Sequence, residues 1–238
     1  MKKDIHLNIT TEGQTEFRFV KDVLYKHLQP LGIYCNVRSV LTSKEYKKRG
    51  GMSSYIKAKK DIQQWIKQDN SADRRFTTMF DFYALPHDFP GYAEAQKLNN
   101  PYDKVACIEK AFAEDMKDYR FIPYLQLHEF EALIYSDLDI LSCEYENKAN
   151  AIKYLKAVLS QSPFNHNPEL INDRKETSPS HRIISEIPEY QKVSSGSLLT
   201  ELITIDVIRT KCQHFNEWLT KLEQLNQSFS FSNNYNSP

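Results

Sequence analysis

The sequence has few of the residues that would indicate a disulfide-rich protein, a cysteine-based zinc protein or a membrane-spanning protein. Its 238 residues include four cysteines and six glycines. The cysteines form no CxxC pair, which argues against a zinc site made of cysteine alone, and free thiols in a reducing cytoplasm are the simpler interpretation. No run of about 18 apolar residues occurs, so we expect no membrane-spanning segment. The first residues contain no apolar stretch of the kind that signal peptides have.

The chain also lacks an excess of charge of either sign. Lysine plus arginine and aspartate plus glutamate each number 31, so the formal net charge is zero. A nucleic-acid partner would therefore be held by a local basic patch or through a metal ion. The glycines form no G-x-x-x-x-G-K-[ST] motif, so we predict no ATPase activity of the chain itself. An apolar content of 40% and a charged content of 26% are those of an ordinary globular protein.

Strand and helix patterns alternate along the first half of the chain. Ile5, Leu7 and Ile9 alternate with polar residues, as in a half-buried strand, and a helical period follows over residues 17–28. This alternation is typical of an α/β protein with a mostly parallel sheet flanked by helices. Further strands are predicted over residues 34–41, 76–83 and 120–127, and further helices over 54–68 and 103–118.

The second half is predicted to be mainly helical. Helices are expected over residues 144–161 and 198–226, the latter split near residue 204. Between them, residues 163–190 are rich in proline, asparagine and serine, which indicates a long ordered loop. The predicted organisation is an α/β core, a helical and loop elaboration packed on it, and a frayed tail, over residues 1–140, 141–226 and 227–238.

Acidic side chains follow the predicted strands. Glu12 comes directly after the first strand, with Glu16 about one helical turn later, and Asp81 lies near the end of the strand over 76–83. Because ligands gather at the carboxyl ends of strands in α/β sheets, Glu12 and Asp81 are expected to meet if their strands are neighbours. Their oxygens suit Mg²⁺ or Mn²⁺ better than zinc. The alternative is structural, with Glu12 complementing a helix dipole and Asp81 capping a turn.

A further acidic group follows the strand predicted over 120–127. The order His128-Glu129-Phe130-Glu131 is not a zincin motif, because alanine stands where the second histidine would be. If a helix begins here, His128 and Glu131 share a face and Glu129 points elsewhere. Either glutamate could join the metal ligands, and His128 could brace a carboxylate or contact a substrate. A histidine satisfied within the core is the alternative.

Two later segments could supply positive charge to such a site. Residues 172–182 contain Lys175 and Arg182, which could hold a phosphate together with backbone N–H groups. Lys192 precedes the last predicted helix and could stabilise the charge that develops during phosphodiester cleavage. A solvated surface loop and an ordinary exposed lysine are the plain alternatives.

Several of these blocks resemble Toprim-like domains, as found in OLD-family nucleases, primases and topoisomerases. Residues 11–16, Thr-Glu-Gly-Gln-Thr-Glu, resemble their opening motif. Longer blocks are similar to a bacterial family of Toprim-like proteins grouped with the RloB-like proteins, and together they extend over nearly the whole chain. These blocks are residues 80–91, 126–133, 171–180, 190–196 and 208–219.

The resemblance implies a Toprim-like α/β core with an acidic site for Mg²⁺ or Mn²⁺. Carried over residue by residue, it assigns metal binding or catalysis to Glu12, Glu16, Asp81 and Lys192. It also implies an ATPase partner of the AAA or ABC type in anti-phage defence loci, with this chain as a nuclease effector that acts on nucleic acid in the cytoplasm. Self-association into a homo-oligomer is left open.

One departure from the Toprim pattern concerns the acids after the central strand. Toprim domains normally carry Asp-x-Asp there, whereas Asp81-Phe82-Tyr83 supplies one acid. Glu129 or Glu131 could compensate for the missing carboxylate. A non-catalytic binding or scaffold subunit, and a metal-dependent enzyme acting on nucleotides, are therefore alternatives to a nuclease.

Overall fold

A parallel sheet lies at the centre of the protein, whose structure is a computed structural model. It describes residues 4–40, 52, 54–171 and 175–227. The five strands of the sheet follow the order β2-β1-β3-β4, and β5 also pairs with β3. They are β1 (Ile5–Thr11), β2 (Ile33–Ser39), β3 (Arg74–Asp81), β4 (Phe121–Ile122) and β5 (Leu125–Gln126). The predicted α/β class with a parallel, Rossmann-like core is confirmed.

The central strand β1 is buried on both of its faces. It pairs in parallel with β2 on one side and with β3 on the other, so that Leu7 lies opposite Cys35 and Arg75. Its alternating residues Ile5, Leu7 and Ile9 are fully buried. Asn8, Thr10 and Thr11, between and after them, are buried as well. The strand is therefore more enclosed than its two-residue pattern predicts, as is typical of parallel sheets covered by helices on both sides.

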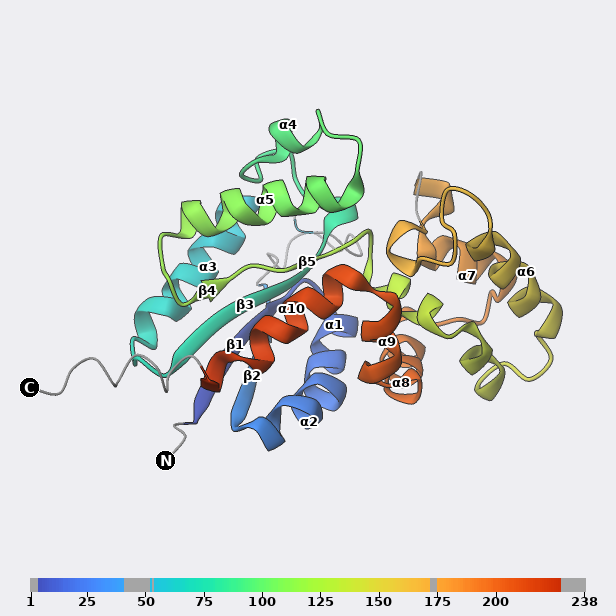
Figure 1. Ribbon diagram of the computed structural model, residues 1–238, viewed down its shortest axis with the longest axis horizontal. Coiled ribbons are helices and arrows are strands. Elements are labelled where there is room, and N and C mark those ends of the chain that lie inside the picture. Colours follow the sequence, from blue (N-terminus) through green and yellow to red (C-terminus); the bar gives the residue numbers. More distant parts are fainter. Residues whose placement is uncertain (1–3, 41–51, 53, 172–174, 228–238) are drawn as a thin grey trace, which may run out of the picture.

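Helices cover both faces of the sheet (Figure 1). In one layer Phe19 and Phe215 join the apolar residues of β1, and in the other Phe112 packs near Phe76 and Phe80 of β3. Across the described residues, no helix is long and apolar enough to cross a membrane. The first layer contains α1 (Gln14–Phe19), η1 (Val20–Leu24), α2 (Tyr25–Leu28) and α10 (Gln213–Glu223), and the second contains α3 (Tyr55–Gln68), α4 (Tyr92–Ala95) and α5 (Pro101–Met116).

A smaller helical part lies beyond one end of the sheet, around α6 (Ala149–Ser160) and α7 (Pro179–Glu186) (Figure 1). The helix predicted over 144–161 begins only at Ala149. The loop predicted over 163–190 contains a helix, α7, which begins with a proline in its first turn after Ser178. Proline at a helix start was the signal for this element. The part consists of η4 (Phe130–Ser136), η5 (Leu138–Cys143), α6 (Ala149–Ser160) and α7 (Pro179–Glu186).

The last predicted helix is three separate helices. They are α8 (Lys192–Ile203), α9 (Ile205–Lys211) and α10. The predicted break near residue 204 is confirmed, because Thr204 adopts a φ of 73° and ends α8. A second break at Cys212, in extended conformation, was not predicted. These two breaks turn the chain back so that α10 lies along the sheet (Figure 1).

The strand predicted over 120–127 is split into β4 and β5. Proline at position 123 has no N–H to give to a sheet ladder. At the gap, the Thr78 hydroxyl donates to the carbonyl of Tyr124 and accepts from its N–H, both at 3.0 Å. A threonine side chain therefore replaces the missing ladder bonds inside the sheet, where an unsatisfied backbone group would be costly.

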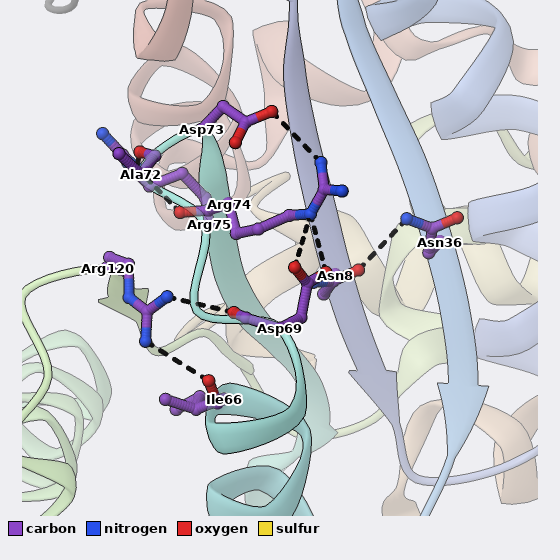
Figure 2. Close-up of polar contacts among 9 residues, drawn as sticks. All are labelled: Asn8, Asn36, Ile66, Asp69, Ala72, Asp73, Arg74, Arg75 and Arg120. Atoms are coloured by element: carbon purple, nitrogen blue, oxygen red, sulfur yellow. Dashed lines mark hydrogen bonds and ion pairs between the residues drawn. The ribbon is translucent and has the colours of Figure 1, made fainter.

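A polar network fixes the turn before β3 to its neighbours in the sheet (Figure 2). Both oxygens of Asp69 accept from Nε of Arg74 at 2.7 Å, and one also accepts from Asn8 at 3.3 Å. The side-chain amide oxygen of Asn8, Oδ1, accepts from Nδ2 of Asn36 at 3.1 Å. Arg120 donates to the Asp69 carbonyl at 3.0 Å. Side chains of β1 and β3 thus meet at one carboxylate, which satisfies the buried amide of Asn8, and Asn8 connects this network to Asn36 of β2.

Candidate functional site

The structure brings the predicted acids together at the carboxyl ends of the strands. Glu12 follows β1, Asp81 ends β3, and the other acids come from α1 and from the segment after β5. The charges of the other four acids all act on Asp81. We call this group the acidic cluster: Glu12, Glu16, Asp81, Glu129 and Glu131.

Glu12 connects the ends of β1 and β3. One carboxylate oxygen accepts the N–H of Asp81 at 3.1 Å, and the other accepts the N–H of Met52 at 3.0 Å. Burial raises the pKa of Glu12 to about 7, against the hydrogen bond from Asp81, and the charge of Glu16 raises it further. Glu12 therefore gains or loses a proton near neutral pH, unlike an ordinary surface glutamate.

Glu16, and not Glu12, caps the first helix. Its carboxylate accepts the N–H of Gly13 at 2.8 Å, in the manner of a capping box. A Cβ on Gly13 would lie 3.0 Å from the same carboxylate oxygen, so glycine allows this close approach. Glu16 is only 6% exposed, and its burial raises its pKa. The cap therefore places a second carboxyl group beside Glu12.

Asp81 has a buried oxygen without a partner. Within the part of the chain that the structure describes, Oδ1 of Asp81 makes no hydrogen bond. Burial and the neighbouring carboxylates raise the pKa of Asp81 well above its usual range. A charged oxygen in this position is costly, so Asp81 must hold a proton or face a cation.

Lys192 covers the cluster from the solvent side. Its Nζ lies 3.0 Å from Glu129 and 3.5 Å from Glu131. The lysine side chain is 43% exposed, whereas those of Glu129 and Glu131 are 8% and 3% exposed. Burial lowers the pKa of Lys192, but the charges of Glu131 and Glu129 outweigh it, so the net shift is upward. The ammonium group therefore stays charged and borders both the acids and the solvent.

The two glutamates under Lys192 have opposite pKa shifts. Burial raises the pKa of Glu131 to about 8, although Lys192 opposes the shift. For Glu129, burial also acts upward, but Lys192 and the hydrogen bond from Ser180 outweigh it and lower the pKa. The Ser180 N–H lies 2.6 Å from Oε1 of Glu129. At neutral pH Glu129 is thus the charged member of this pair.

The predicted helix starting at His128 is wrong. His128 has a φ of 64°, Glu129 is extended, and a 3₁₀ helix begins only at Phe130. His128 and Glu131 therefore do not share a helical face; instead Glu129 and Glu131 both reach Lys192. The His128 carbonyl accepts the N–H of Tyr83 at 2.9 Å, and its side chain is buried. The predicted contact of His128 with a substrate stays a prediction.

Arg182 and Lys175, the predicted phosphate-binding residues, have different positions. Arg182 lies in α7, where its Nε donates to the Thr177 carbonyl at 2.7 Å and its guanidinium group stands over the Phe164 ring. It therefore braces the segment before its own helix. Lys175 begins a short 3₁₀ turn, η7 (Lys175–Thr177), and residues 172–174 lie outside the described residues. Their role at a phosphate stays a prediction.

Sequence reasoning missed Tyr190 and the backbone of Ser180. The Tyr190 hydroxyl is buried and, among the described residues, has no hydrogen-bond partner. A Cβ on Gly196 would lie 3.3 Å from this hydroxyl and 2.9 Å from a methyl carbon of Thr15. Glycine in the first turns of α8 thus lets that helix approach α1. Because the last helix was predicted to begin only at residue 198, Gly196 lay outside the predicted helical pattern and gave no signal for this contact.

The donor set suits a hard cation, although the side chains are not arranged around one. Within the described ranges, no three His, Cys, Asp or Glu side chains are positioned to hold a metal ion as they stand. The unpartnered Asp81 oxygen and the carboxyl groups with raised pKa values nevertheless supply the oxygen ligands that Mg²⁺ and Mn²⁺ prefer. Binding would require some of these side chains to turn.

The fold and the acidic cluster define an α/β protein with carboxyl groups gathered at the carboxyl ends of a parallel sheet. The chain belongs to the family described as "Domain of unknown function (DUF4276)", which matches residues 11–223. That match begins at the last residue of β1 and ends at the last residue of α10, so it contains the acidic cluster and Lys192. No curated protein and no solved structure matches the chain.

Proposed function

We propose that this protein is a Mg²⁺- or Mn²⁺-dependent nuclease that hydrolyses phosphodiester bonds. The observation that carries the proposal is the buried oxygen of Asp81, which has no hydrogen-bond partner among the described residues, together with four further carboxyl groups and Lys192 beside it. A cluster of carboxyl groups with raised pKa values lowers the stability of the folded state. Such clusters are typical of functional sites. The sequence resemblance to Toprim-like and RloB-like proteins supports the same chemistry.

Different residues of the chain would have different roles in this hydrolysis. Glu12, Asp81 and Glu131, with Glu16 beside them, would hold the ion, which supplies Lewis-acid activation of the phosphate and of the attacking water. Lys192 would stabilise the negative charge that develops on the phosphate. Its position between Glu131 and solvent suits this role, because a substrate arriving from outside meets the ammonium group first.

The proposed partner is an ATPase of the AAA or ABC type, with the chain as effector subunit in anti-phage defence. This part rests on the resemblance alone. A non-catalytic scaffold subunit of such a complex is the second candidate. It is favoured by the absence, among the described residues, of a group of side chains already arranged around a metal, and by Tyr83, which is 39% exposed and adds no acid after β3.

An assay on nucleic acids tests the proposal. The purified protein would be incubated with DNA and RNA in Mg²⁺, Mn²⁺ or EDTA, alone and with the ATPase encoded beside it. We expect cleavage that needs the metal and that falls by about 100-fold or more in Asp81→Asn and Glu12→Gln. Glu94→Gln, in an exposed position of α4, is the matched control. Cleavage that persists in Asp81→Asn would exclude this active site.

A further inference from the structure

We propose that Glu129 is a positioning residue that ties Lys192 to helix α7, and that it is not a metal ligand. The catalytic meaning of this tie rests on the proposed function, but the tie itself does not. Glu129 is the N-cap residue of η4 and is extended, which turns its carboxylate toward α7 and α8. It is 6% exposed.

Both oxygens of Glu129 have partners from other elements. Oε1 accepts the N–H of Ser180 at 2.6 Å, and Oε2 pairs with Nζ of Lys192 at 3.0 Å. Ser180 is the second residue of α7, so its N–H is one of the groups that the helix itself leaves unsatisfied. The carboxylate therefore meets the positive end of one helix and a cation from the first residue of another.

Glu12 and Asp81 are bound differently from Glu129. Among the described residues, the oxygens of Glu12 accept only backbone N–H groups and Oδ1 of Asp81 has no partner. Neither group is hydrogen-bonded to an ammonium group among the described residues, so a metal ion could bind them without displacing one. Glu129 is already neutralised by Lys192, so a metal ion would have to compete with an ammonium group for it.

A second residue of η4 also contacts the first turn of α7. The Tyr135 hydroxyl, also in η4, donates to the Pro179 carbonyl at 3.2 Å. Glu129 and Tyr135 thus bind the N–H and the C=O of one peptide group, the one that joins Pro179 to Ser180 at the start of α7. Because Glu129 also holds Lys192, the position of the lysine over Glu131 depends on α7 being docked.

Two substitutions separate the two halves of the tie. In Glu129→Gln, the amide oxygen still accepts from Ser180, but the amide N–H₂ cannot pair with Lys192. In Glu129→Ala, both contacts are lost. We expect hydrogen exchange of the Ser180 amide to accelerate by about tenfold or more in Glu129→Ala and to stay near the wild-type rate in Glu129→Gln. Glu131→Gln is the control, because Glu131 pairs with Lys192 of α8 and, among the described residues, makes no hydrogen bond to α7.

Metal binding supplies the decisive readout. Titration with Mn²⁺ alone, monitored by calorimetry, should give an unchanged Mn²⁺ affinity in Glu129→Gln and a loss of Mn²⁺ binding in Asp81→Asn. Any cleavage activity should fall in both variants. Loss of Mn²⁺ affinity in Glu129→Gln equal to that in Asp81→Asn would overturn the proposal, as would unchanged Ser180 exchange in Glu129→Ala. If no nucleic acid is cleaved, the exchange and binding results still decide the role of Glu129.

Discussion

At the scale of single residues, Asp81 is the point on which the acidic cluster converges. In the part of the chain that the structure describes, one of its buried oxygens has no hydrogen-bond partner, and its raised pKa reflects burial first and then four neighbouring carboxyl groups. An arrangement of this kind weakens the folded state, because folding must either take up a proton or bring charges together. Residues that lower the stability of the folded state without a compensating structural contact are typical of functional sites.

Replacement of Asp81 should therefore separate stability from function. Asp81→Asn removes the buried acid and keeps the shape of the side chain, so we expect the free energy of unfolding to rise by about 1 kcal/mol in metal-free buffer at pH 7. Urea unfolding followed by circular dichroism measures the change. The conservative substitution Asp118→Asn, which breaks a largely buried pair with Arg120, should lower stability instead. A less stable Asp81→Asn protein would contradict the view of Asp81 as a strained group.

The residues of the site differ in how far the sequence alone reveals them. Glu12 and Asp81 were predictable because each stands at the end of a strand with a clear apolar pattern. The tie from Glu129 to Ser180 was not, since the partners are 51 positions apart and the acceptor meets a backbone N–H. The same applies to Met52, whose contact with Glu12 also uses only its backbone. Backbone partners leave no residue-type signal in a sequence.

At the scale of elements, the start of α10 shows how the C-terminal helices attach to the sheet. The fully buried carboxylate of Glu169 accepts the N–H groups of His214 and Phe215, both at 2.9 Å, in place of a capping side chain within the helix. Further along, the Trp218 indole donates to Thr77 of β3 at 3.0 Å and stacks on Tyr124. Capping from a distant element is again invisible to sequence pattern, which explains the missed break at Cys212.

The ion pair between His214 and Glu109 should make the docking of α10 depend on pH. Burial lowers the pKa of His214, but the hydrogen bond to Glu109 and the charges of Glu109, Glu169 and Glu217 outweigh it, so the net shift is upward from 6.5. A raised histidine pKa adds stability that is fully present below pH 6.5 and disappears as the pH rises through the folded-state pKa. The distance from Nε2 to Glu109 is 3.0 Å.

The test compares wild type with His214→Gln. We expect the wild type to exceed the variant in free energy of unfolding at pH 6, and the difference to shrink by pH 8.5, in urea titrations at both values. Exposed Glu217→Gln in the same helix should leave most of the pH dependence in place. A difference that is constant with pH would show that His214 contributes by packing on Tyr124 rather than by charge.

At the scale of the whole molecule, segments from the entire chain meet at one edge of the sheet, the edge formed by the carboxyl ends of the strands. Alternating strands and helices predicted the parallel sheet, and strand ends predicted where the acids would gather. The return of the chain through α8 to α10 was predicted only in part, because Lys192 begins α8 instead of preceding the last helix. That placement brings the start of the C-terminal helices onto the acids that follow β1, β3 and β5.

A divalent cation bound at this edge should therefore stabilise the whole fold. Without it, the folded state carries carboxyl groups held at unfavourable pKa values, and an ion that binds the folded state alone adds about 2.7 kcal/mol at 100 times its dissociation constant. For a chain of this size we expect the unfolding midpoint to rise by roughly 5–10 °C with Mn²⁺, measured by differential scanning calorimetry against EDTA. Asp81→Asn should abolish the rise and Glu94→Gln should keep it. An equal rise in all three proteins would mean that the cation binds elsewhere. The carboxyl groups of the acidic cluster would then bind protons but no metal ion.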